Sequence, residues 1–242
     1  RILMLEPRRL AARAAAGFMA RQLGEDVGQT VGYRIRHESR VSAATRIEVV
    51  TEAILTRMLQ DDPALEGIGA LLFDEFHERN LHSDLGLALA LEVQSALRNE
   101  LRIVLMSATL EGERLARFLD APRVASEGRS HSVAIAYLAA RANEPELAHL
   151  RRALETALVD SDGDVLVFLP GKAEIERARG VAEAVVASTS RGETASVHAL
   201  HGELALAEQA QLLAPHPPDE RRIVLATNVA ESSINLPQVL AV

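Results

Sequence analysis

The chain has 242 residues, of which 48% are apolar and 25% are charged, and its net charge is −8. This composition is typical of a folded globular protein with a sizeable core and excludes disordered, collagenous and fibrous chains. No apolar run approaches the roughly 20 residues that span a bilayer, and the absence of cysteine excludes disulfides, zinc–thiolate sites and thiol catalysis, so we expect a cytoplasmic protein without a membrane segment.

Basic residues gather near the N-terminus. Residues 1–46 hold nine arginines and four acidic residues, a local net charge of +5, so the remainder carries −13. A nucleic-acid-binding coat over the whole protein is therefore excluded, whereas a basic face in the N-terminal region is allowed. Scattered, solvated arginines would give the same count.

Short apolar runs alternate with amphipathic stretches. We predict strands at Ile2–Leu5, Ile47–Val50, Ala70–Phe73, Ile103–Met106, Val133–Tyr137, Val165–Leu169, Ser196–Leu200 and Ile223–Ala226, with another beginning at Val239. Helical periodicity predicts helices at Arg8–Leu23, 54–59, Leu85–Leu97, Glu146–Val159, Ala173–Val186 and Ala205–Leu213. Strands that are apolar on both faces and alternate with helices predict an α/β fold with mainly parallel sheets.

The stretch Asp120–Ser132 shows the least structure and contains Pro122 and Gly128. We expect a domain boundary there, with one α/β domain at residues 1–125 and a second at 126–242. The chain starts inside an apolar strand and ends as another begins, so we expect both domains to be incomplete parts of a longer protein.

The strongest local signal is the run from Leu71 to His77, an apolar strand that ends in Asp74 and Glu75. Parallel α/β sheets bind ligands at the carboxyl ends of their strands, and nucleoside triphosphatases place magnesium-orienting acids there. In this interpretation Asp74 orients hydrated Mg²⁺ and Glu75 polarises the attacking water. The alternative is a strand that ends in solvated acids and a turn. A zinc site is excluded, because His77 and His82 are five residues apart instead of four.

Weaker signals follow other strands. Glu6-Pro7-Arg8-Arg9 opens a helix, where free N–H groups and arginines suit a phosphodiester backbone. Thr51 opens another helix, where it could equally be an ordinary N-cap. Ser107-Ala-Thr109 and the polar run Ala226–Ser233 each follow a strand and are suggestive only together with the acids.

Taken in order, these residues resemble superfamily 2 helicases of the DEAH-box group, most closely the bacterial HrpB-type helicases, over essentially the whole chain. The matching segments are Glu6–Ala12 (motif Ia), Thr51–Leu55 (Ib), Asp74–His77 (II), Ser107–Thr109 (III), Phe168–Gly171 (IV) and Ala226–Ser233 (V), with Val31–Arg36 and Leu200–Leu204 as further family segments. The resemblance implies two tandem RecA-like domains that close on ATP and Mg²⁺.

The resemblance also implies roles for single residues. Asp74, Glu75 and His77 would be catalytic, with Asp74 and Glu75 on the metal and His77 linking motif II to motif III or to the neighbouring domain. Ser233 and Asn235 would contact the nucleotide, and Ser107 and Thr109 would couple the motifs. Single-stranded nucleic acid, which we expect to be RNA, would contact Pro7, Arg8, Arg9, Thr51, Thr227 and Asn228.

The chain departs from the family pattern at several points. Phe76 replaces the alanine of the DEAH name, and Ile234-Asn235-Leu236-Pro237 replaces the usual sequence after motif V. The phosphate-binding loop is expected before residue 1 and the arginine finger after residue 242. The one lysine, Lys172, lies in Leu166–Ala173, which lacks the first glycine and the hydroxyl of a P-loop. Two alternatives stay open, a non-enzymatic nucleic-acid-binding module and a magnesium-dependent phosphohydrolase.

Overall fold

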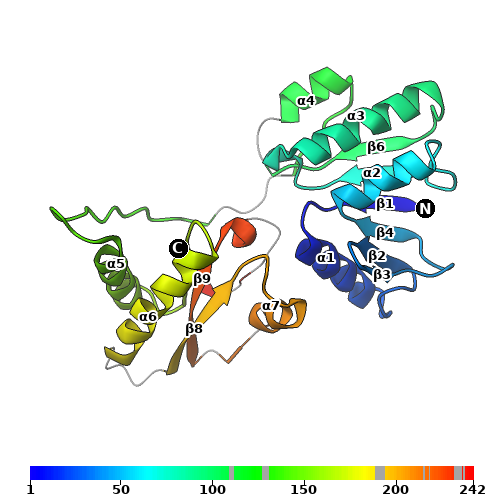
Figure 1. Cartoon of the computed structure of the whole chain (residues 1–242). Helices are drawn as coiled ribbons and strands as arrows, with labels where there is room; N and C mark the ends of the chain where they lie inside the picture. The colour runs from blue at the N-terminus through cyan, green and yellow to red at the C-terminus, as the bar shows by residue number, and fades with distance from the viewer. Residues whose placement is uncertain are drawn as a thin grey trace. The chain divides into compact units, whose positions relative to one another are not determined.

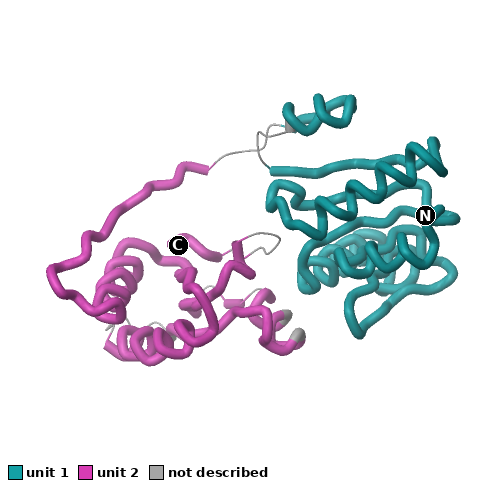
Figure 2. Tube along the Cα trace, turned by 45° about the horizontal axis from the view of Figure 1, so that its top comes forward, with its two compact units in different colours: residues 1–127 teal, residues 128–242 magenta. Residues whose placement is uncertain are grey.

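The computed structural model describes residues 1–108, 112–126, 131–188, 194–214, 216–217, 219–231, 236 and 238–242. The chain divides into two compact units, residues 1–127 and 128–242 (Figure 2). Each unit is built on a mainly parallel sheet, which confirms the predicted α/β class. The expected domain limits, 1–125 and 126–242, stay a prediction. None of the helices in these described ranges is long and apolar enough to cross a membrane.

Unit 1 contains a six-stranded sheet in the order β3-β2-β4-β1-β5-β6. Its strands are β1 (Ile2–Leu5), β2 (Val31–Ile35), β3 (Glu38–Arg40), β4 (Ile47–Val50), β5 (Ala70–Phe73) and β6 (Arg102–Leu105). Its helices are α1 (Arg9–Gln22), α2 (Glu52–Asp61), α3 (Leu81–Ala96) and α4 (Gly112–Leu119), and η1 (Phe76–Glu78) is a 3-10 turn. β3 is antiparallel to β2, and the other described pairs in this sheet are parallel.

Helices α1, α2 and α3 lie along the sheet of unit 1 (Figure 1). The strands separate two hydrophobic cores, one on each face of the sheet. Leu3 and Leu5 of β1 pack with buried leucines of α2 and α3 on one face. Met4 contacts the opposite core, to which α1 contributes an alanine stripe of Ala12, Ala16 and Ala20. This arrangement follows from the sequence, because successive side chains of a strand point to opposite faces.

Unit 2 contains a four-stranded parallel sheet in the order β10-β7-β9-β8. Its elements are α5 (Glu146–Asp160), β7 (Asp164–Phe168), α6 (Lys172–Ser188), β8 (Thr194–Leu200), α7 (Leu206–Leu213), β9 (Glu220–Ala226), the 3-10 turn η2 (Asn228–Ala230) and β10 (Val239–Ala241). Val165, Ile223 and Leu225 pack against α5 and α6, whereas Leu166 and Val224 belong to the core that α7 covers.

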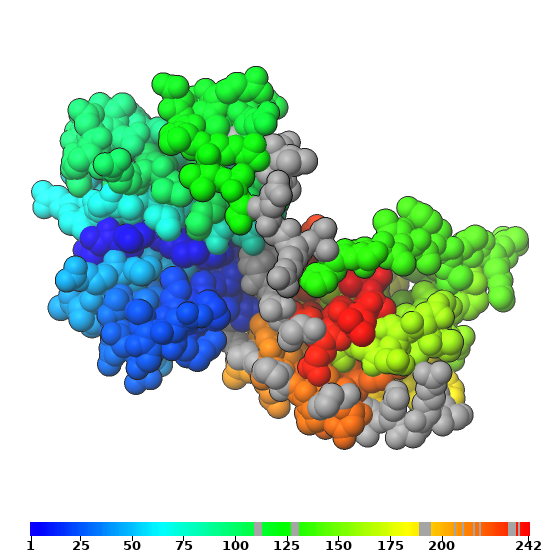
Figure 3. Space-filling view, turned by 180° about the vertical axis from the view of Figure 1, so that it is seen from behind, coloured from blue at the N-terminus to red at the C-terminus, as the bar shows by residue number. Residues whose placement is uncertain are grey.

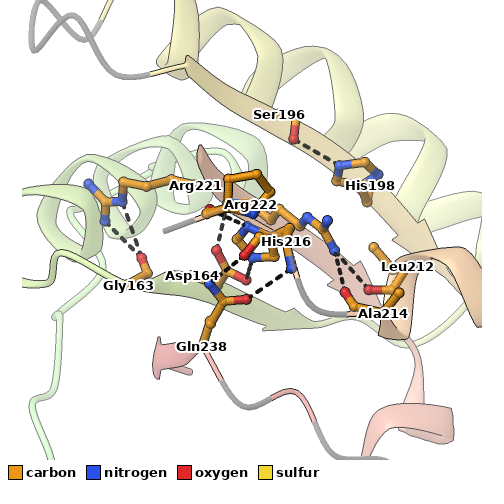
Figure 4. Close-up of polar contacts among 11 residues, drawn as sticks. Gly163, Asp164, Ser196, His198, Leu212, Ala214, His216, Arg221, Arg222 and Gln238 are labelled. Atoms are coloured by element: carbon orange, nitrogen blue, oxygen red, sulfur yellow. Dashed lines mark hydrogen bonds and ion pairs between the residues drawn. The ribbon is translucent and has the colours of Figure 1, made fainter. Parts of the chain in front are cut away.

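Polar contacts hold the amino-terminal edge of the second sheet together (Figure 4). Asp164, the first residue of β7, accepts a hydrogen bond from the backbone N–H of Arg222 in β9 at 2.8 Å. The other carboxylate oxygen of Asp164 lies 2.8 Å from Nε2 of His216, and the amide of Gln238 donates to the carbonyl of His216. These contacts join β7, β9, the segment after α7 and the entry to β10. The opposite, carboxyl edge is the one that carries the sequence motifs.

Several predicted elements differ from the structure. The strand expected at Val133–Tyr137 is wrong, because this stretch has no strand assignment, and Val133, Ile135 and Tyr137 are at least three-quarters exposed. Residues 131–140 form an exposed segment without helix or strand, which can be followed in Figures 2 and 3. Alternating apolar residues give the pattern of a strand, but a strand also needs a neighbour to accept its backbone hydrogen bonds. β2, β3 and α4 were not expected as elements from the sequence.

Candidate active site and nucleic-acid interface

Four neighbouring strands of unit 1 end at one edge of the sheet, and a polar motif follows each of them. The parallel register places Leu5 beside Val50 and Phe73, and Phe73 beside Leu105. Motifs Ia, Ib, II and III, which begin at Glu6, Thr51, Asp74 and Ser107, are therefore neighbours in space. This is the edge at which open α/β sheets bind ligands.

Motif II forms a tight turn directly after β5. The N–H of Asp74 donates to the carbonyl of Leu5 at 3.0 Å, and a carboxylate oxygen of Asp74 accepts from the N–H of Glu75 at 2.8 Å. Glu75 has φ 50° and Arg79 has φ 49°, so left-handed residues stand on both sides of η1. Non-glycine residues in this region cost on the order of 1 kcal/mol each, so the surrounding contacts must hold the turn.

Phe76 anchors the turn in the core. Its ring is 2% exposed and packs edge-on against Phe73, with 6.3 Å between the ring centroids. Its N–H donates to the carbonyl of Met106 at 3.0 Å, and the N–H of Met106 donates to the carbonyl of Phe73. Motif II is thus joined through the backbone to the residue that precedes motif III. The phenylalanine that departs from the DEAH pattern has a packing role.

His77 contacts the second acid of the motif. Its Nδ1 lies 3.4 Å from a carboxylate oxygen of Glu75, and both side chains are about one-fifth exposed. The expected link from His77 to motif III stays a prediction. A connection between the two motifs is provided by the backbone hydrogen bond from Phe76 to Met106.

A third carboxyl group, that of Glu6, lies against the two expected metal acids. Glu6 is 4% exposed, and its Oε2 atom is buried without a hydrogen-bond partner among the described residues. Burial, followed by the charge and hydrogen bond of Asp74 and the charges of Glu75 and Glu78, raises the pKa of Glu6 to about 8. Sequence reasoning assigned no role to Glu6. The available signal was its position directly after a parallel strand next to β5.

The donor set fits a magnesium ion. No group of three or more histidine and acidic side chains with metal-binding geometry occurs within the described ranges. Mg²⁺ does not require one, because it is usually held by one or two carboxylates, water molecules and substrate phosphates. In addition to burial, the negative charges of Asp74, Glu75 and Glu78 raise the pKa of Glu6. A divalent cation bound at this edge would neutralise the same charges.

The start of α1 carries two arginines, one exposed and one largely buried. Arg8 is the N-cap residue, its own side chain makes no capping hydrogen bond, and the first turn of the helix contains no acidic residue. Arg9 is exposed, whereas Pro7 is half-buried. Arg8 is largely buried, and its guanidinium forms an ion pair with Glu78 at 3.2 Å. Arg9 is thus exposed at the start of the helix, whereas the guanidinium of Arg8 contacts an internal carboxylate.

Thr51 occupies the N-cap position of α2, but its side chain makes no capping hydrogen bond. The threonine is buried. The neighbouring Glu52 accepts a hydrogen bond from the hydroxyl of Ser83 at 2.8 Å, and burial raises the pKa of Glu52. Motif Ib is therefore tied to α3, the helix that follows the motif II turn.

The corresponding edge of unit 2 carries motifs IV and V. The N–H of Thr227 donates to the carbonyl of Leu200, and its hydroxyl accepts from the N–H of Val229, so Thr227 caps η2. Beside it lies a surface hollow of about 550 Å³, lined by Phe168, Leu169, Pro170, Asn228 and Glu231. Lys172 begins α6 and pairs with Glu203 at 3.0 Å. Thr109, Ser233 and Asn235 lie outside the described residues.

Comparisons with known proteins relate the chain to helicases. Residues 146–242 match the family described as "Helicase conserved C-terminal domain". The chain is 45% identical over 237 residues to the ATP-dependent RNA helicase HrpB of Escherichia coli, covering 98% of this chain and 29% of that protein. It is 32% identical to an ATP-dependent RNA helicase HrpA homolog of Haemophilus influenzae, covering 97% of this chain and 18% of that protein.

Solved structures give the same result. A crystal structure of the E. coli DEAH/RHA helicase HrpB matches with a TM-score of 0.88 and 44% identity, covering 98% of this chain and 30% of that chain. A second crystal structure, of the E. coli DExH-box NTPase HrpB, matches with a TM-score of 0.79 at the same identity, covering 98% and 29%. The chain thus spans less than a third of the length of these relatives.

Proposed function

From its membership of the HrpB-like DEAH-box helicases, we propose that the chain is part of an ATP-dependent RNA helicase. The helicase would couple ATP hydrolysis to movement along a single strand and to duplex unwinding. The observation that carries the proposal is the shared sheet edge of unit 1. It brings the motif II acids next to the basic start of α1, so that a magnesium-nucleotide site and a phosphodiester site are neighbours.

In the hydrolysis step, Asp74 would hold the water shell of a bound Mg²⁺, which would supply charge neutralisation for the phosphates. Glu75 is the carboxylate that accepts a proton from the attacking water, and the contact with His77 orients it. The backbone hydrogen bond from the N–H of Phe76 to the carbonyl of Met106 gives motif III a direct connection to this turn.

Ser107 and Thr109 are assigned the coupling role, and Ser233 and Asn235 the nucleotide contacts, on the resemblance of their segments to motifs III and V. For strand binding, the proposal uses Pro7, Arg8, Arg9 and Thr51 in unit 1 and Thr227 and Asn228 in unit 2. Support comes from the first turn of α1, which contains no acidic residue, from the exposed Arg9, and from the hollow beside Asn228. Contacts of this kind go to the backbone and do not read sequence.

The test uses a full-length protein that contains these residues together with a phosphate-binding loop. Phosphate release is measured with and without single-stranded RNA, and unwinding is followed on a duplex with a single-stranded overhang. The proposal expects RNA-stimulated hydrolysis and ATP-dependent unwinding. Strand binding without any turnover would instead identify a non-enzymatic binding module, and RNA-independent turnover would favour a simple phosphohydrolase.

A further inference from the structure

One ion pair joins the expected nucleic-acid face to the catalytic turn. The Nη2 atom of Arg8 lies 3.2 Å from Oε1 of Glu78, across 70 residues of sequence, and each side chain is only about one-fifth exposed. Arg8 is the N-cap of α1, and Glu78 is the last residue of η1. The N–H of Glu78 donates to the carbonyl of Glu75 at 2.9 Å, so Glu78 is one hydrogen bond away from the expected catalytic acid.

We propose that the Arg8–Glu78 pair is a switch through which strand binding reaches the catalytic turn: a phosphodiester of the bound strand takes the guanidinium of Arg8 from Glu78. The proposal rests on the function proposed above. It assigns Glu78 as a positioning residue that does not touch nucleotide or metal, and it makes Glu78 and a phosphodiester of the strand alternative partners of the Arg8 guanidinium.

The exchange is favourable because both partners offer oxygen acceptors that suit a guanidinium, and the pair is close enough to the surface for a phosphate to reach it. Glu78 also lies in the negative field at this edge, where its charge helps to raise the pKa of Glu6. When Arg8 leaves, the turn loses a counter-ion there. Because Glu75 and Arg79 hold left-handed conformations at its ends, the turn depends on its contacts and will readjust.

The same turn provides a matched control. Arg79 pairs with Asp84 at 2.9 Å, but this ion pair is more exposed and ties the turn to α3 instead of α1. The substitutions Glu78→Gln and Asp84→Asn remove one negative charge each from ion pairs of the same turn. Their general electrostatic effects on a polyanion are therefore similar, and a difference between them reports the release of Arg8.

The first measurement is the affinity of the 242-residue chain for a fluorescein-labelled single-stranded RNA, by anisotropy, over a range of salt concentrations. Glu78→Gln is expected to bind about twofold to fivefold more tightly than Asp84→Asn, because strand binding no longer has to break the Arg8 ion pair. In an Arg8→Ala background this difference should vanish. Glu78→Asp, which withdraws the carboxylate by one methylene, should be intermediate and provides a second variant if Glu78→Gln folds poorly.

The second measurement is amide hydrogen exchange of residues 75–79 with and without the RNA. Strand binding should change exchange in the original chain but not in the Arg8→Ala variant. The inference is overturned if Glu78→Gln and Asp84→Asn bind alike, or if their difference persists without Arg8. If the original chain does not bind single strands at all, both the proposed function and the switch are contradicted for this chain. Binding that weakens in Arg8→Ala while the two variants stay equal removes the switch alone.

Discussion

The carboxyl group of Glu6 is buried next to that of Asp74, because the two residues follow the paired ends of the adjacent parallel strands β1 and β5. Burial is the largest cause that raises the pKa of Glu6 to about 8, and the neighbouring Asp74 raises it further. Glu6 therefore keeps its proton to a higher pH than an exposed carboxyl group would, at the edge where the nucleotide is expected.

Stability should depend on pH through this group. The pKa of Glu6 rises from an ordinary 4.5 to about 8, so between these values the folded chain keeps a proton that the unfolded chain releases. The free energy of unfolding therefore falls as pH rises across this window. Glu6→Gln, whose side chain has a similar shape but does not ionise, should be more stable than the original by roughly 2–4 kcal/mol at pH 9 and nearly equal at pH 4.5.

Urea unfolding followed by circular dichroism at several pH values checks this, with the exposed Glu155→Gln as the control. Parallel pH profiles for Glu6→Gln and the original chain would show that Glu6 ionises normally in the folded state.

The two motif II acids should have separable effects in an ATP-hydrolysing protein that contains them. Glu75→Gln keeps the shape but loses the base, so turnover should fall by about 10²–10⁴ while nucleotide binding persists. Asp74→Asn should also weaken magnesium-dependent binding, because that carboxylate orients the metal's water shell. A fluorescent nucleotide analogue and phosphate release report the two properties. Near-normal phosphate release by Glu75→Gln would remove motif II from the mechanism.

The 242-residue chain by itself should hydrolyse ATP at a negligible rate. Its single lysine, Lys172, begins α6 and pairs with Glu203, and no Gly-Lys-Ser/Thr loop occurs in the sequence. A colorimetric phosphate assay with Mg²⁺ and single-stranded RNA measures the rate, with Glu75→Gln as the blank. Turnover above that blank would mean that phosphates are bound without a P-loop lysine.

Gly163 should not tolerate a side chain. A Cβ there would lie 2.5 Å from Cγ of Leu240 and 2.7 Å from the carbonyl oxygen of Gln238, at the contact between β7 and β10. Gly163→Ala should cost roughly 1–3 kcal/mol through overpacking. Gly180→Ala, in α6 with no atom near the added Cβ, should instead stabilise the chain by about 0.5–1 kcal/mol. Thermal unfolding of both variants gives the comparison, and equal midpoints would contradict it.

Strand prediction succeeded where burial on both faces makes the whole strand apolar. β1 and β5 match the predicted ranges residue for residue. β2 was missed because Gly32 and Arg34 interrupt its apolar residues. A charged residue is tolerated in this strand because Arg34 forms an ion pair with the buried Glu48 of the neighbouring strand β4. The expected strand at Val133–Tyr137 failed for the converse reason, since its pattern is correct and a pairing neighbour is missing within the described residues.

The part of the candidate site that could be predicted is the part that depends on the order of the motifs and on where the strands end. Asp74 and Glu75 could be assigned to the ligand-binding edge because parallel strands present their carboxyl ends together. The partners of Glu6 and Arg8 could not, because they depend on which strands are neighbours and on how the motif II turn bends. Both Asp74 and Glu78 are about 70 residues away in the sequence, beyond the reach of local patterns.

Lys172, whose ion pair with Glu203 is exposed, offers a specific attachment point for a dye in distance measurements by fluorescence. Lys172 is the one lysine, and it stands at the start of α6 in unit 2, so an amine-reactive dye has a single side-chain target besides the N-terminal amine. Because the chain has no cysteine, one cysteine introduced at an exposed position of α1 would accept a second, thiol-reactive dye. Energy transfer between the two dyes would then report the distance between the units as nucleotide and RNA are added.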